Sequence, residues 1–75
     1  MIAPWNQYPE IPRYSIGWRM GAGEGYLDSF IEWLYQQDEA AVRDYLLSNP
    51  PPEDWQNLFD YHLEKMRSGK GPWES

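Results

Sequence analysis

The chain has 75 residues, a net charge of −6 and no cysteine. It is long enough for one domain, and a domain of this size buries only about 60% of the surface that its unfolded chain exposes. Disulfides are excluded, and a structural zinc site is disfavoured because there is no thiolate and His62 is the only imidazole. Stability must therefore come from aromatic packing or from a partner, and 5 Trp, 6 Tyr and 2 Phe supply the rings.

Residues 1–23 predict an irregular but ordered arm that is rich in proline, glycine and aromatic residues. Pro4, Pro9 and Pro12 interrupt regular structure, although residues 14–18 could form a short strand. A disordered tail would be poor in large apolar side chains, whereas Ile, Trp, Tyr and Met recur along this arm. We therefore expect the arm to pack across the rest of the chain or onto a partner.

The rest of the chain predicts an all-α, small three-helix domain over residues 24–70. The first helix, 24–37, is indicated by apolar residues at three- and four-residue spacing. The second, 39–48, follows Asp38, a favourable N-cap, and must end before the next prolines. The predicted core consists of Leu27, Phe30, Ile31, Leu34, Leu46, Leu58 and Phe59.

The third helix is predicted over residues 52–68. It starts at Pro52, carries acids in its first turn and bases in its last turn, and can end at Gly69. Its inner stripe should contain Trp55, Leu58, Phe59, His62 and Met66. Residues 71–75 are expected to be a flexible tail.

The charge is concentrated in one part of the chain. Residues 24–64 hold ten acids against one base, Arg43, which gives this segment a net charge of −9. Such a field disfavours direct nucleic-acid binding, which requires cations to neutralise phosphates, and adsorption to anionic membranes. It favours association with a basic protein surface, although solubility alone would also explain a charge of this size.

The sequence offers little for catalysis or for a cofactor. His62 is the only histidine, and no triad spacing, calcium loop or phosphate-binding motif is present. Gly21 and Gly23 could cradle an anion at a helix start, but a tight turn into the first helix is the better interpretation, in which Arg19 can pair with Glu24 or with another carboxylate of that helix. We therefore predict no enzyme activity, no cofactor and no metal site.

These observations predict a small acidic module that binds a basic protein surface stoichiometrically, as an inhibitor, immunity protein, antitoxin or accessory subunit does. The alternatives are a nucleic-acid mimic, with helix carboxylates in place of phosphates, and, less favoured, a small enzyme. A homo-oligomer is compatible with the sequence, and the expected location is cytoplasmic, because no leader or membrane span is evident. The predicted partner-binding residues are Trp5, Tyr8, Trp18, Arg19, Asp28, Glu32, Asp60 and Glu64.

Overall fold

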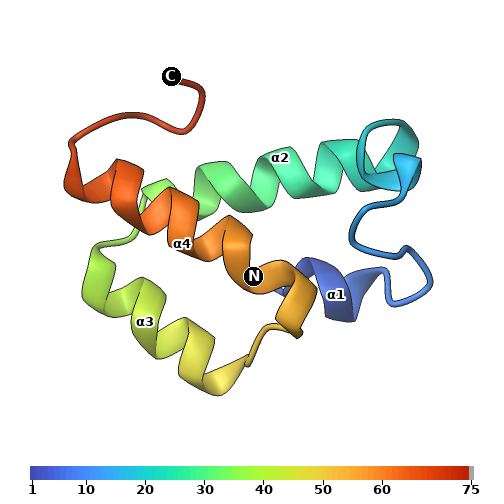
Figure 1. Cartoon of the computed structure of the whole chain (residues 1–75), viewed down its shortest axis with the longest axis horizontal. Helices are drawn as coiled ribbons and strands as arrows, with labels where there is room; N and C mark the ends of the chain where they lie inside the picture. Colours follow the sequence, from blue (N-terminus) through green and yellow to red (C-terminus); the bar gives the residue numbers. More distant parts are fainter. Residues whose placement is uncertain (75) are drawn as a thin grey trace.

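The computed structural model describes residues 1–74 and confirms the all-α fold (Figure 1). The elements are α1 (Pro4–Gln7), the 3-10 helix η1 (Ile16–Trp18), α2 (Gly21–Tyr35), α3 (Glu39–Ser48) and α4 (Glu53–Arg67). The alternative of a short strand over 14–18 is wrong, because this segment contains η1, and residues 1–74 hold no strand. The expected flexible tail, 71–75, is described only as far as Glu74, and Ser75 lies outside the described residues.

The glycines before α2 determine where that helix begins. Gly21 has φ +71°, in the left-handed region that favours glycine, and α2 starts there, three residues before the predicted position. Two residues later the helix passes directly against η1, since a Cβ at Gly23 would stand 2.1 Å from the carbonyl oxygen of Gly17. The glycine-rich segment thus lets two backbones meet, which supports the structural interpretation of this motif.

We expect Gly23→Ala to destabilise the protein by about 1–3 kcal/mol or more, because the new methyl group would overlap backbone atoms that cannot rotate away. Gly25 is the matched control within the same helix, since a Cβ there would meet nothing within 4 Å. Gly25→Ala should instead stabilise the fold by about 0.5–1 kcal/mol through helix propensity. Urea unfolding of the two variants would measure both effects, and changes of equal sign would contradict this account.

The ends of α3 and α4 follow the predicted capping. The Asp38 carboxylate accepts a hydrogen bond of 2.7 Å from the backbone N–H of Ala41, which confirms it as the N-cap of α3. Gly69 has φ +74°, its N–H donates to the carbonyl of Met66, and the N–H of Lys70 donates to the carbonyl of Lys65. This pair of hydrogen bonds is a Schellman motif, which ends α4 where the sequence predicted.

The core lies where α2, α3 and α4 meet. Phe30, Leu34, Val42, Phe59 and Leu63 form its buried cluster. Of the predicted core, Phe30, Ile31, Leu34 and Phe59 are buried. The other three are half-buried: Leu46 and Leu58 pack against this cluster, whereas the prediction was wrong for Leu27, which is not part of it. A domain this small has little interior, so residues at the flanks of its helices stay partly exposed.

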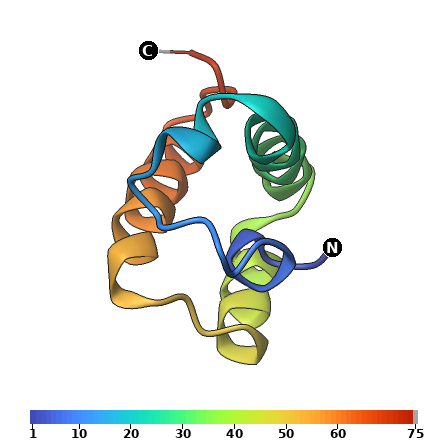
Figure 2. The same ribbon diagram turned by 90° about the vertical axis from the view of Figure 1, so that its right-hand side faces the viewer.

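The arm is ordered and closes one end of the molecule, where it runs from α1 past α4 to the start of α2 (Figure 2). The ring of Trp5 lies 5.4 Å from that of Trp55 and 5.7 Å from that of Phe59. Two tyrosine hydroxyls bond the backbone at the start of the arm. Tyr45 donates to the carbonyl of Met1 at 2.8 Å, and Tyr26 donates to the carbonyl of Ile2. The arm is therefore part of the folded domain and contributes rings to its interior.

Candidate protein-binding surface

Most of the acidic segment is exposed and unpaired. Of its ten carboxylates, Glu39 forms ion pairs, Asp38 caps α3, and Glu32 accepts a hydrogen bond from Trp73 Nε1 at 3.4 Å. The others are exposed and have neither an ion pair nor a side-chain hydrogen bond within residues 1–74. They are Glu24, Asp28, Asp44, Glu53, Asp54, Asp60 and Glu64.

Two arginines beside the α4 acids are paired with another carboxylate. Arg43 and Arg67 both bond to Glu39 Oε1, at 3.3 and 2.5 Å. The two arginines also line a recess of about 400 Å³ with Asp60 and Glu64, but they form no ion pair with either acid. The carboxylates of α4 are therefore not neutralised by the cations beside them.

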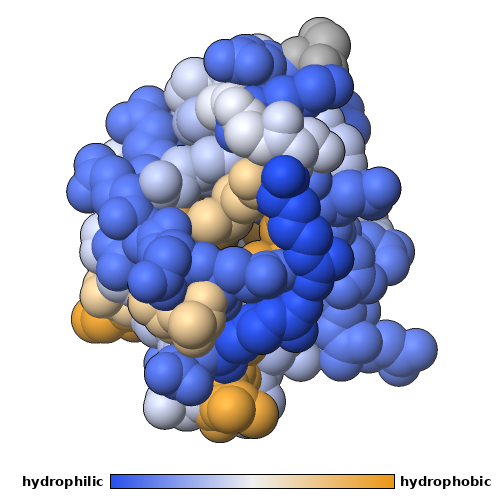
Figure 3. All heavy atoms as spheres, turned by 90° about the vertical axis from the view of Figure 1, so that its left-hand side faces the viewer, coloured by the Kyte–Doolittle hydropathy of each residue, from blue (hydrophilic) through white to orange (hydrophobic). Residues whose placement is uncertain are grey.

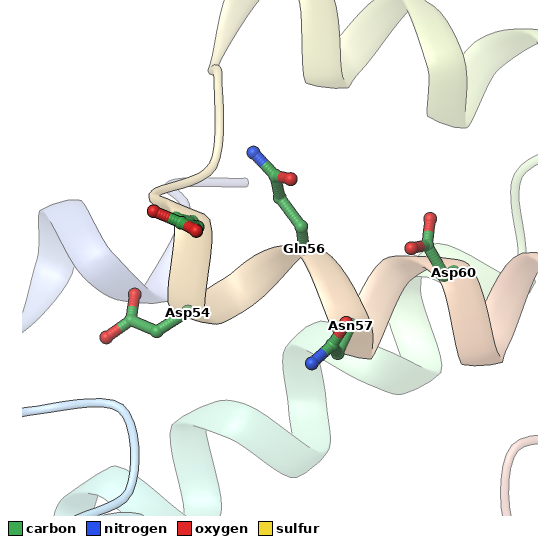
Figure 4. Close-up of a pocket in the computed structure, with 5 residues that line it drawn as sticks. Asp54, Gln56, Asn57 and Asp60 are labelled. Carbon is green, nitrogen blue, oxygen red and sulfur yellow. The ribbon is translucent and has the colours of Figure 1, made fainter.

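Along α4, a wide recess of about 570 Å³ is lined by Glu53, Asp54, Gln56, Asn57 and Asp60, with no cation among them. Gln56 and Asp60 extend from one side of the helix, and Asp54 and Asn57 extend from the other (Figure 4). These side chains diverge, so they do not converge on one atom as a metal ion or a catalytic step requires. Within residues 1–74, no three His, Asp or Glu side chains are grouped to hold a metal ion.

The predicted acidic residues fall on two helices. Asp28 and Glu32 lie on α2, where both are exposed. Asp60 and Glu64 lie one turn apart on α4 and line the same recess. The structure thus brings the α4 pair together on one recess, whereas Glu32 contacts the C-terminal segment through Trp73.

The aromatic residues predicted to contact a partner pack inside the protein. Trp18 is 5% exposed, and its ring lies 5.1 Å from that of Trp55 and 6.1 Å from that of Tyr8. Trp5 and Tyr8 are half-buried. Arg19 is exposed, and within residues 1–74 it forms no ion pair with Glu24 or with another carboxylate of α2.

A different ring, Tyr61, lies at the acidic surface. It is 55% exposed and directly follows Asp60 on α4. On its other side it lines a recess with Glu64, Lys65, Ser68 and Lys70, and Lys65 Nζ lies 5.2 Å from the centre of its ring. Tyr61 lies outside the inner stripe predicted for this helix, so the same helical periodicity could have identified it as exposed. We refer to Glu53, Gln56, Asn57, Asp60, Tyr61 and Glu64, all exposed, as the acidic α4 face.

His62 lies on the opposite, inner side of α4. It is 6% exposed, and its Nδ1 is 2.6 Å from the hydroxyl of Tyr35. Burial, with a smaller contribution from the Lys65 charge, lowers the pKa of His62 to about 4. The imidazole is therefore neutral near pH 7, and it is packed between the rings of Tyr35 and Tyr61 as part of the interior.

A second hollow opens at the end of the molecule where α4 finishes and α3 starts. Figure 3 shows this face, with hydrophobic surface inside the hollow and a hydrophilic rim around it. A recess of about 400 Å³ there is lined by Tyr35, Gln37, Asp38, Glu39, Met66, Arg67, Gly69 and Lys70. Its rim carries both signs of charge. Asp38 already accepts a hydrogen bond from the backbone N–H of Ala41, and Glu39 forms an ion pair with Arg67. This hollow consequently shows no preference for a charged ligand.

Comparisons of the chain with protein-family models, with curated proteins and with solved structures find no significant match. Over the described residues, the model contains no helix with the length and apolar character needed to cross a membrane.

Proposed function

We propose that this chain is a small protein-binding module that associates with a basic surface of another protein through the acidic α4 face. The observation that supports this proposal is the combination of exposed, unpaired carboxylates with an exposed tyrosine on one helix. Carboxylates steer an oppositely charged partner into contact, and a tyrosine supplies the apolar area that retains it.

The chemistry of this face favours binding over catalysis. In the recess along α4, Asp54 and Asp60 extend from different sides of the helix, and the imidazole of the same helix is buried. We propose that the module acts by stoichiometric association, as an inhibitor, immunity protein, antitoxin or accessory subunit would, in the cytoplasm.

The proposal predicts an association rate that depends on charge. The partner would be copurified from source cells, identified by mass spectrometry, and its binding measured by surface plasmon resonance. Replacing Asp60 and Glu64 by lysine should slow association about tenfold or more at low salt, because long-range attraction becomes repulsion. High salt should reduce the difference, since exposed charges are screened beyond about 8 Å at physiological ionic strength.

Two controls test whether the effect belongs to the acidic α4 face or to the net charge of the protein. Lysines at Glu24 and Asp44, exposed acids of α2 and α3, change the net charge equally and should slow association less. Tyr61→Ala should mainly speed dissociation. Equal rates for wild type and all variants would contradict the proposal. Competition between the protein and duplex DNA or RNA for the partner would instead indicate a nucleic-acid mimic.

A further inference from the structure

A smaller recess, lined by basic instead of acidic residues, lies on the arm. It has a volume of about 190 Å³ and is lined by Arg13, Tyr14, Ser15, Trp18, Arg19 and Leu27. Two arginines are among its lining residues, and no acidic residue is. In a chain with 12 acids and 6 bases, two arginines at one recess without a lining acid are unusual.

Aromatic rings, and not carboxylates, position Arg13. Its Cζ lies 4.8 Å from the centre of the Trp55 ring and 5.1 Å from that of the Tyr14 ring. Its Nε is buried and has no hydrogen-bond acceptor among the described residues. Cation–π contacts hold a guanidinium in place without cancelling its charge, and a buried donor without an acceptor is unfavourable. Arg13 therefore keeps its charge and its capacity to donate hydrogen bonds.

Arg19 stands at the same recess. It is exposed, and within residues 1–74 its side chain makes no ion pair, hydrogen bond or ring contact. The recess therefore combines one guanidinium fixed by rings with one that is free to move. Arginine is well suited to carboxylates, because its planar fork forms two parallel hydrogen bonds with them.

Exposed apolar side chains lie next to the two arginines in the sequence. Tyr14, Ile16 and Met20 are 72%, 67% and 62% exposed, and they flank Arg13 and Arg19 in the sequence. Cofactors and drug-sized ligands occupy pockets of about 300–1,000 Å³, so a recess of about 190 Å³ has room for one side chain. Two cations are too few for nucleic acid, whose affinity depends on many phosphate contacts.

We infer that the Arg13–Arg19 recess is a docking site for one carboxylate side chain of an acidic protein segment. Arg13 and Arg19 bind the carboxylate, and apolar side chains next to it in that segment contact Ile16 and Met20. Arginine and aromatic residues around a small pocket are the usual composition of an interface hot spot. This site is separate from the acidic α4 face and selects the opposite charge, so it does not depend on the function proposed above.

A pair of synthetic peptides tests the inference. The probe is a capped octapeptide of alternating glutamate and leucine, and its control has glutamine in place of glutamate. In ¹⁵N-resolved NMR titrations at low salt, the glutamate peptide should shift the resonances of residues 13–20 and the indole of Trp18. The glutamine peptide should bind about tenfold more weakly or not at all, because it cannot form charge-assisted hydrogen bonds.

Variants then test which residues bind the glutamate peptide. Arg19→Gln removes an exposed side chain without internal contacts and should weaken the glutamate peptide about tenfold. Arg13→Lys keeps the charge but loses the planar fork, and it should also weaken binding. Arg43→Gln removes one positive charge on α3 and should leave binding unchanged, as should the lysine substitutions at Asp60 and Glu64.

Three results would overturn the inference: equal binding of the two peptides, wild-type affinity in Arg19→Gln, or shifts centred away from residues 13–20. Sedimentation provides a further test. Dimerisation that both Arg19→Gln and the Asp60/Glu64 substitutions abolish would show that the carboxylate comes from a second copy of this chain, and not from a different partner.

Discussion

Replacing Phe30 by alanine is expected to lower the free energy of unfolding by about 3–5 kcal/mol, through lost burial and the cavity left behind. Phe30 is fully buried. Its ring lies 5.9 Å from the rings of Trp33 and Tyr45 and 6.1 Å from that of Phe59, so it joins α2, α3 and α4. A loss of this size approaches the whole stability of a small domain, and the variant should be largely unfolded at room temperature.

Urea unfolding followed by circular dichroism would measure this change. Leu47→Ala is the matched control, because Leu47 is a large apolar residue that is 80% exposed. Its substitution should change stability by less than about 0.5 kcal/mol. A cooperative transition of Phe30→Ala at the wild-type urea concentration would show that the three helices do not depend on this ring.

The second large effect should come from pH. The buried, neutral His62 has a pKa of about 4 in the folded protein, against 6.5 when it is free. Well above pH 6.5 the imidazole is neutral in both the folded and the unfolded protein, so it does not change the free energy of unfolding. As pH falls from 6.5 to 4, the unfolded state binds the proton first, and stability should fall by up to about 3 kcal/mol.

His62→Gln separates this effect from the titration of carboxylates. Glutamine cannot be protonated in this range but retains an amide that can bond the hydroxyl of Tyr35. The hydrogen bond from Arg67 lowers the pKa of Glu39 below its ordinary value of 4.5, so the stability from Glu39 is lost only at lower pH. The stability of the variant should therefore no longer fall between pH 6.5 and 4, but it should still fall below pH 4. An unchanged profile in His62→Gln would refute this role of the imidazole.

The helices could be predicted from the sequence because their signals are local. Asp38 and the proline after Asn49 bracket α3, whose observed bounds equal the predicted ones. Gly69 likewise ends α4 through hydrogen bonds to residues within one turn. The start of α2 was less predictable, since it depends on the φ of Gly21 and on the approach of Gly23 to Gly17.

The division of the rings between interior and surface could not be predicted, because it depends on contacts far apart in the sequence. Trp18 was expected at a partner surface, but Trp55 covers it from 37 positions away in the chain. The same distant ring holds Arg13, which no local pattern distinguishes from Arg19. The exposure of Tyr61 is the exception and could be predicted, because helical periodicity alone places it outside the inner stripe of α4.

The contacts of the arm also have a consequence for synthesis on the ribosome. The rings that Trp5 packs against, those of Trp55 and Phe59, are translated about 50 residues after it. At about 5–20 residues per second this interval lasts about 3–10 s. During that time the indole of Trp5 and the apolar residues near it have no native site to occupy. The arm can therefore reach its native site only after α4 has been translated.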